Sequence, residues 1–305
     1  MKIKRVTAIF FSPCGNAEKA ATIIARGIGD ELNVPVEYDD FTLPENRMRK
    51  RLFEDDDLVV FALPVYAGRI PNKVLPFVQS LFEGNHTLVI PMVLFGNRSY
   101  DNALKELCFE LDTKGFLPIG AAAWVSEHSF SNKLASGRPD EEDIVMMREF
   151  AEAVMKKLKL RKSHSVAEQA EKEISGMIAE RKAYDICPSD INHIFLDIDE
   201  IPGEWPLEKY YTPLGVDGKP AFFLKAKPKT DISKCNHCGI CAVNCPMGSI
   251  SREDVNVVSG ICMKCQACVK KCPQGARYFD DEAFLSHVKM LEQNYSCRKE
   301  SSVFI

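Results

Sequence analysis

The chain has 305 residues, 46% of them hydrophobic and 27% charged, so it is long enough for two ordinary globular domains. Its net charge of −4 favours neither nucleic acid nor an anionic membrane surface as a partner. No apolar run approaches the ~20 residues that span a bilayer. The basic, then apolar N-terminus lacks a small-residue cleavage site and predicts a first strand rather than a signal peptide. We therefore expect a cytoplasmic protein that has no membrane span and does not bind nucleic acid.

Strand-like and helix-like segments alternate through the first 160 residues. Continuous apolar runs predict strands at Val6–Phe11, Val34–Tyr38, Leu58–Leu63, Thr87–Phe95 and Gly115–Trp124. Apolar residues at helical spacing predict helices at Ala17–Leu32, Lys73–Leu81, Tyr100–Thr113 and Glu141–Lys159. This alternation predicts an α/β fold, a doubly wound parallel sheet with right-handed crossovers.

The next segment, residues 161–229, carries no recognisable motif. A charged helix is predicted over Val166–Tyr184, followed by the Pro- and aromatic-rich stretch IPGEWPLEKYYTPLGVDGKP. Low-complexity disorder is not expected, because five aromatic side chains there favour burial: Trp205, Tyr210, Tyr211, Phe222 and Phe223. We interpret the segment as a connector that packs on the domains.

Cysteine usage changes abruptly near residue 230. Eight of the twelve cysteines lie between Cys235 and Cys272, in the runs CNHCGICAVNCP and CMKCQACVKKCP. A cytoplasmic chain keeps its thiols reduced, so such a cluster indicates metal ligation. Each run is C-x2-C-x2-C-x3-C-P, the spacing of bacterial iron–sulfur ferredoxins, in which the fourth cysteine ligates the other cluster.

The two runs form an internal repeat and predict two [4Fe–4S] clusters. The first set of ligands is Cys235, Cys238, Cys241 and Cys272, and the second is Cys262, Cys265, Cys268 and Cys245. The competing interpretations are two zinc sites or a disulfide scaffold. Zinc motifs pair two CxxC units across a longer insert, so the pattern favours iron–sulfur clusters over zinc.

A second candidate site begins at the turn SPCGNA, between the first predicted strand and helix. It is neither a G-x-G-x-x-G fingerprint nor a Walker loop, and alone it predicts only a connector. Two more glycine-containing loops follow later strands, LPVYAGRIP (Leu63–Pro71) and FGNRSYDNAL (Phe95–Leu104). Ligands of doubly wound sheets bind outside the carboxyl ends of strands, so the three loops together indicate one binding site.

With these loops and the double cysteine run, the whole chain resembles the fused flavodoxin–ferredoxin proteins of anaerobic bacteria and archaea, which are iron–sulfur flavoproteins. The resemblance implies a flavodoxin-like sheet of strand order 2-1-3-4-5 and a C-terminal α+β 2[4Fe–4S] ferredoxin-like domain. The expected organisation is an FMN-binding domain (1–160), the connector (161–229), a ferredoxin domain (230–282) and a helical tail (283–305).

The resemblance also implies FMN as a cofactor, held by the three loops. The phosphate loop would be Ser12, Pro13, Cys14, Gly15, Asn16 and Ala17. The ring-binding loops would supply Pro64, Tyr66, Ala67 and Gly68, then Gly96, Asn97, Arg98, Tyr100 and Asp101. The family usually has Thr where Cys14 and Ala17 stand. Losing two hydroxyl donors would weaken FMN binding by about one to two orders of magnitude.

Several residues near these loops are weaker candidates. A helix N-terminus lowers a thiol pKa, which makes a reactive Cys14 conceivable, although no motif supplies a base or a resolving cysteine. His128 could approach the flavin edge, and Arg69 or Arg98 could balance the charge of the phosphate or of reduced flavin. No residue is singled out as catalytic.

The sequence favours an electron-transfer protein that passes electrons between two [4Fe–4S] clusters, FMN and redox partner proteins. One alternative is a flavin-dependent oxidoreductase that reduces a small acceptor at FMN, with the clusters as an internal wire. Another is a flavin-less ferredoxin whose first domain only docks partners. If flavin and clusters lay far apart within one chain, a homodimer would be needed to complete the path.

Overall fold

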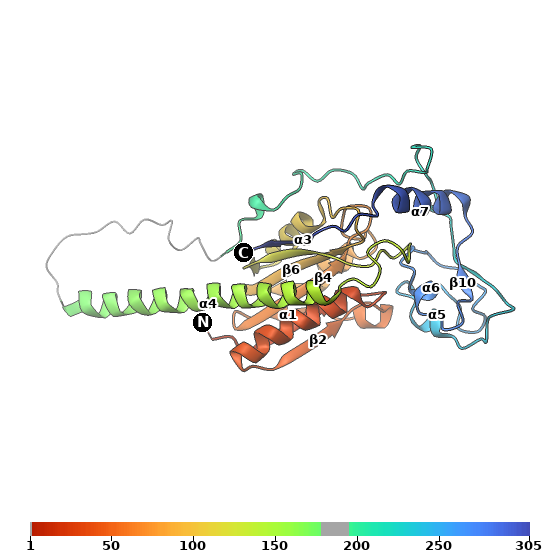
Figure 1. The fold of residues 1–305 in the computed structure, drawn as a ribbon. Helices are drawn as coiled ribbons and strands as arrows, with labels where there is room; N and C mark the ends of the chain where they lie inside the picture. Colours follow the sequence, from red (N-terminus) through yellow and green to blue (C-terminus); the bar gives the residue numbers. More distant parts are fainter. Residues whose placement is uncertain (1, 178–194) are drawn as a thin grey trace.

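The structure, a computed structural model, describes residues 2–177 and 195–305 (Figure 1). Its centre is a parallel sheet with strand order β8-β6-β4-β1-β2, and β11 is added antiparallel to β8. The strands are β1 (Arg5–Phe10), β2 (Val36–Asp40), β4 (Asp57–Pro64), β6 (Thr87–Phe95), β7 (Phe116–Pro118, paired with β6), β8 (Ala121–Val125) and β11 (Ser302–Phe304). The predicted order 2-1-3-4-5 is confirmed, with β11 as an addition.

Helices cover both faces of the sheet. On one face lie α1 (Asn16–Leu32) and α4 (Glu141–Met177), side by side in Figure 1, and on the other lie α2 (Leu75–Leu81) and α3 (Ala103–Asp112). Successive side chains of a strand point to opposite faces. In β4, Leu58 and Val60 therefore pack under α1 and α4, whereas Val59 and Phe61 pack under α2 and α3. Burial on both sides explains the continuous apolar strands of the sequence.

Several elements differ from the sequence prediction. The predicted strand Gly115–Trp124 is divided into β7 and β8, and the short parallel pair β3 (Arg51–Phe53) and β5 (Phe82–Gly84) was not predicted. Helix α4 runs on to Met177 and so includes the start of the predicted helix Val166–Tyr184, whose end lies outside the described residues. No helix within residues 2–177 and 195–305 combines the length and the apolar character that a membrane crossing requires.

The described part of the connector follows the α3 side of the sheet toward the carboxyl ends of the strands. A short 3-10 helix, η4 (Ile198–Glu200), leads to Ile201, which is buried in the core under α3. The Trp205 ring packs on the Phe109 ring, with 4.0 Å between the centroids. The predicted burial of the aromatic side chains in this segment is confirmed only in part, because Trp205 is half exposed and Phe222 is largely exposed.

The cysteine-rich segment forms a small module with helices α5 (Ile240–Val243) and α6 (Ala267–Lys270) and an antiparallel pair, β9 (Lys229–Thr230) and β10 (Arg277–Tyr278). It sits beyond the carboxyl ends of the sheet strands (Figure 1). Arg47, buried in the 3-10 helix η1 (Pro44–Arg47), donates from Nη2 to the carbonyl of Pro246 at 2.9 Å. Lys270 pairs with Glu127 on the loop after β8. These contacts fix the module against the sheet.

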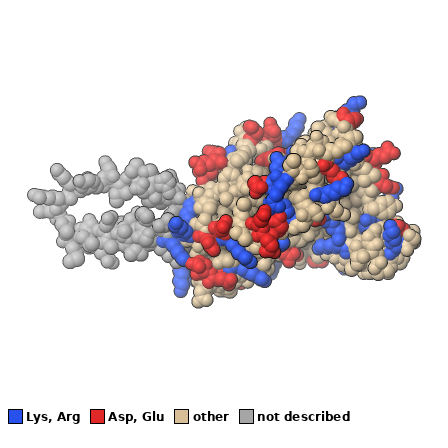
Figure 2. Space-filling view, in the orientation of Figure 1, with Lys and Arg blue, Asp and Glu red and all other residues tan. Residues whose placement is uncertain are grey.

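The chain then returns to the sheet through α7 (Glu282–Asn294) and adds β11, which pairs with β8. Asn97, 1% exposed, holds this return segment. Its Nδ2 donates to the carbonyls of Tyr295 (2.6 Å) and Cys297 (2.8 Å), and its Oδ1 accepts from the Lys299 amide. Over the face in Figure 2, acidic and basic side chains are interspersed.

Replacing Asn97 with Ala should loosen the return segment. Three hydrogen bonds of the buried Asn97 side chain disappear and two partly buried carbonyls lose a donor, which costs about 1–3 kcal/mol. Hydrogen exchange of the β11 amides, followed by mass spectrometry, should therefore become at least roughly tenfold faster. The matched control is Asn294→Ala at the exposed end of α7, which should leave β11 exchange unchanged. Equal exchange in both variants would contradict the role of Asn97.

Candidate functional site

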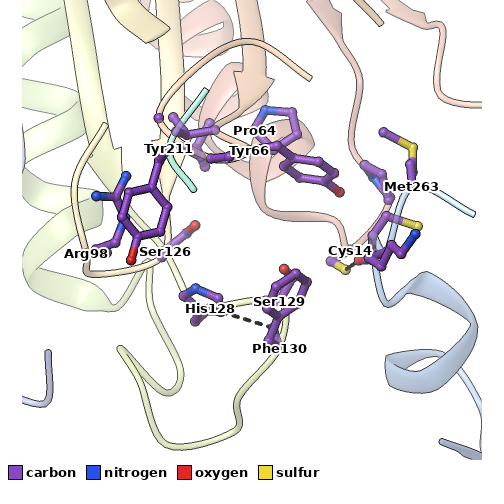
Figure 3. Close-up of a pocket in the computed structure, with 18 of the residues that line it drawn as sticks. Cys14, Pro64, Tyr66, Arg98, Ser126, His128, Ser129, Phe130, Tyr211 and Met263 are labelled. Carbon is purple, nitrogen blue, oxygen red and sulfur yellow. Dashed lines mark hydrogen bonds between the residues drawn. The ribbon is translucent and has the colours of Figure 1, made fainter. Parts of the chain in front are cut away.

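A cavity of about 360 Å³ lies at the carboxyl edge of the sheet, within the ~300–1,000 Å³ typical of ligand pockets. The three loops singled out in the sequence converge on it (Figure 3). Eleven of their fifteen candidate residues line it: Ser12, Pro13, Cys14, Asn16, Ala17, Pro64, Tyr66, Ala67, Gly68, Gly96 and Arg98.

The other four candidates do not line the cavity, and each has a structural position of its own. Gly15 precedes α1 with a φ of 92°, and Asn97 binds the return segment. The Tyr100 ring packs on Phe95, and the Asp101 carboxylate pairs with Arg98. These residues shape the loops around the cavity.

The first loop presents the start of α1 to the cavity. The Ser12 hydroxyl accepts from the Glu18 amide at 3.0 Å, and the Ser12 amide donates to Thr42 Oγ1 at 2.7 Å. The first amides of this 17-residue helix and its dipole favour an anion such as a phosphate. The loop thus offers backbone donors where threonine hydroxyls are missing.

Cys14 connects the first loop to the cysteine module. Its thiol donates to the carbonyl of Cys265 at 3.2 Å. Burial raises the pKa of Cys14 to about 11, so the side chain is a neutral thiol and a hydrogen-bond donor. The structure thus gives Cys14 a docking contact and no activated thiolate.

The loop after β8 forms a further wall of the cavity, through Ser126, His128, Ser129 and Phe130 (Figure 3). His128 Nδ1 accepts from the Phe130 amide at 3.0 Å, so a proton on the ring sits at Nε2. Burial, followed by the positive fields of His287, Lys270 and Arg98, lowers the pKa of His128 to about 4. A Cβ on Gly96 would lie 2.5 Å from His128 Cδ2, so the loop requires glycine there.

The connector and α7 complete the wall. The Arg98 guanidinium lies over the Tyr211 ring, 4.1 Å from its centroid. The Tyr211 amide donates to the Ala67 carbonyl at 2.9 Å. His287, on α7, donates from Nδ1 to the Leu214 carbonyl at 2.8 Å. Arg69 is not at the cavity; it is held in an ion pair with the fully buried Glu106. No local motif marks Tyr211 or His287, because only tertiary packing brings them here.

The eight cysteines of the module surround two smaller cavities. One is lined by Cys235, Cys238, Cys241 and Cys272, and the other by Cys245, Cys262, Cys265 and Cys268. These are the two sets expected from the sequence, each with three cysteines of one run and the fourth of the other. Among the described residues, no three His, Cys, Asp or Glu side chains converge closely enough to hold a single metal ion.

The second cysteine cavity and the large cavity share a wall. Met263 and Cys265 line both. In the first set Cys238 is exposed and Cys241 is buried, and in the second set Cys265 and Cys268 are buried. The first cysteine cavity thus has one ligand position open to solvent, and the second adjoins the large cavity.

The chemistry of the cysteine cavities fits iron–sulfur clusters. Each cavity has one lining residue with a buried side-chain N–H that lacks a partner, Arg277 Nε in the first and Gln266 Nε2 in the second. A buried donor without an acceptor is costly, whereas the sulfurs of a cluster accept such bonds. In the described residues only one other buried side-chain atom, Thr7 Oγ1, lacks a partner.

Comparison with known proteins bears on both halves of the chain. A family model described as a 4Fe-4S binding domain matches residues 227–250, which hold the first cysteine run. The match shows a 4Fe-4S binding domain in this part of the chain. The strand order of the sheet gives the N-terminal half a flavodoxin-like fold.

Three further similarities are distant. An uncharacterised protein of Methanocaldococcus jannaschii, MJ0298, is 27% identical over 146 residues, covering 46% of this chain and 91% of its own length. A flavodoxin from an archaeon shows 13% identity with a TM-score of 0.35, covering 51% of this chain and 99% of that one. An NADH:FMN oxidoreductase in its apo form, EmoB, shows 16% identity with a TM-score of 0.35, covering 48% and 86%.

His128 should titrate far below an ordinary histidine in the flavin-free protein. The unfolded chain takes up the proton near pH 6.5, but the folded protein takes it up only near pH 4. The contribution of the neutral His128 ring to the free energy of unfolding is therefore fully present above pH 6.5, and it falls as the pH drops toward 4. NMR titration of labelled histidines should give His128 a pKa near 4, and His128→Gln should flatten this part of the stability profile. A His128 pKa of 6 or above would contradict the buried, neutral ring.

Proposed function

We propose that the chain is an electron-transfer protein that holds FMN in the large cavity and one [4Fe–4S] cluster in each cysteine cavity. The observation that carries the proposal is the wall shared by the large cavity and the second cysteine cavity at Cys265. A flavin and a cluster on either side of this residue would be close neighbours within one chain. Such a path needs no second protomer.

The arrangement also supports an order of transfer. The exposed side of the first cysteine cavity is the point where an external one-electron carrier would exchange electrons with the chain. When bound, the clusters supply one-electron steps and FMN supplies coupling to two-electron chemistry. The chain's own residues orient the flavin, exclude water around Cys265 and hold the second site against the sheet.

The candidate FMN residues have distinct proposed roles. The start of α1 would bind the phosphate through its first amides, supported by Ser12 and Asn16. Tyr66 and Tyr211 line the cavity and would contact the flat ring. His128 would donate from Nε2 to an acceptor on the ring, since its Nδ1 is occupied.

We retain the proposed division into an FMN-binding domain (1–160), a connector (161–229), a ferredoxin domain (230–282) and a helical tail (283–305), with strand β11 of the tail joining the sheet of the first domain. The partners we propose are redox proteins, in the cytoplasm. A second candidate function is favoured by one observation: Tyr211, Pro213, Phe223 and Leu224 of the connector line the cavity. These residues would border a small acceptor beside FMN, as in a flavin-dependent oxidoreductase.

The test is anaerobic purification with iron, sulfide, zinc and flavin quantified together. The proposal requires about eight irons, about eight sulfides and one FMN per chain. About two zinc ions without sulfide would contradict the proposal. Eight irons without FMN, even after the protein is titrated with added FMN, would instead support the alternative of a ferredoxin that holds no flavin. Saturable reduction of one small substrate would favour the oxidoreductase over the carrier.

A pair of cysteine variants tests the order of the sites. Cys265→Ala should remove the second cluster and slow reduction of FMN by an external one-electron donor, measured by stopped-flow absorbance. Cys108→Ala is the matched control, because Cys108 is fully buried in α3 beneath the sheet and lines no cysteine cavity. Unchanged FMN reduction in Cys265→Ala would contradict a path through the second site.

A further inference from the structure

The internal repeat of the cysteine module is broken at two buried positions. Aligned on their cysteines, the two runs place Gln266 opposite Gly239 and Arg277 opposite Ile250. At each position one half of the module has a side chain with N–H donors, and the other half has none. Both donor residues are buried, at 5% and 3% exposure.

Three hydrogen bonds hold the Nη atoms of Arg277. Its Nη1 donates to Thr230 Oγ1 and to the Val255 carbonyl, and its Nη2 donates to the Pro228 carbonyl. Its Nε is buried and has no partner, and the residue lines the first cysteine cavity. A guanidinium carries five N–H donors in a rigid plane, so anchoring the Nη atoms fixes the direction of Nε.

The guanidinium of Arg277 is also a buried positive charge, only 3% exposed, at the first cysteine cavity. In a buried position, such a charge stabilises negative charge on nearby sulfurs more strongly than it would in water.

Gln266 occupies a backbone position suited to glycine. Its φ is +64°, close to the +73° of its counterpart Gly239, in a region that L side chains rarely adopt. The side chain nevertheless lies inside the module, at the second cysteine cavity, with Nε2 buried and unpartnered. The strained backbone thus places an amide donor at this cavity.

We propose that Arg277 Nε–H and Gln266 Nε2–H each donate a hydrogen bond to a sulfur of the cluster in their own cavity, and that these unequal donors set the two reduction potentials separately. Reduction adds negative charge to a cluster, and an N–H donor or a nearby cation stabilises that charge and raises the potential. The inference rests on the proposed function, because it requires clusters in both cavities.

The test exchanges each residue for its counterpart in the other half. Arg277→Ile should lower one of the two midpoint potentials by the equivalent of at least a tenfold change in the reduction equilibrium, or 59 mV for a one-electron couple. Gln266→Gly should lower the other potential, although glycine relieves the backbone. Potentials are read from anaerobic titrations followed by EPR, with iron and sulfide measured in every sample.

A spectroscopic readout separates a direct bond from a general structural effect. With ¹⁵N-labelled arginine, pulsed EPR of the reduced protein should show a nitrogen coupling that Arg277→Lys removes while keeping the charge. Arg277→Lys also replaces Arg277→Ile if the latter loses iron. Full iron content with unchanged potentials in both exchange variants, or a coupling that survives in Arg277→Lys, would overturn the inference. Wild-type protein without iron and sulfide would instead overturn the proposed function.

Discussion

The structure depends on one constraint: the cysteine module is seated on the carboxyl edge of a parallel sheet. All the strand-end loops of such a sheet open toward this edge, so whatever covers it faces the binding site. A partly buried contact from Cys14 to the Cys265 carbonyl and a buried one from Arg47 to the Pro246 carbonyl help to keep the module there. Because both carbonyls belong to the cysteine runs, the contacts also fix the runs relative to the large cavity.

The docking of the module on this edge explains the presence of Cys14 in the first loop. The side chain of Cys14 faces the module and donates to its backbone. If FMN binds as proposed, this interdomain contact takes the place of one hydroxyl at the phosphate, and the first amides of α1 remain for the anion.

The features that could be predicted from the sequence are those encoded in short, contiguous patterns. The cysteine spacing and the three loops after β1, β4 and β6 are contiguous patterns, and the structure brings the corresponding residues together. His128, a weaker candidate from the sequence, lines the large cavity, whereas His287 was missed because it lies on a helix beyond the module. The side chain of Asn97 holds the returning chain, and a buried amide in a loop has the same local pattern whether it binds a ligand or another segment. Tertiary contacts of this kind leave no periodicity in the sequence.

The return of the chain to the sheet through β11 makes the cysteine module an insertion rather than an appendage. Strands of one sheet precede it and follow it, so it is tethered at both ends. A module on a single linker can swing, and the separation of its cofactor sites then varies with time. A module that is tethered at both ends is restricted in this motion, so the proposed flavin and cluster sites would keep a more constant separation. The same architecture means that the first domain cannot be excised without losing a strand of its sheet.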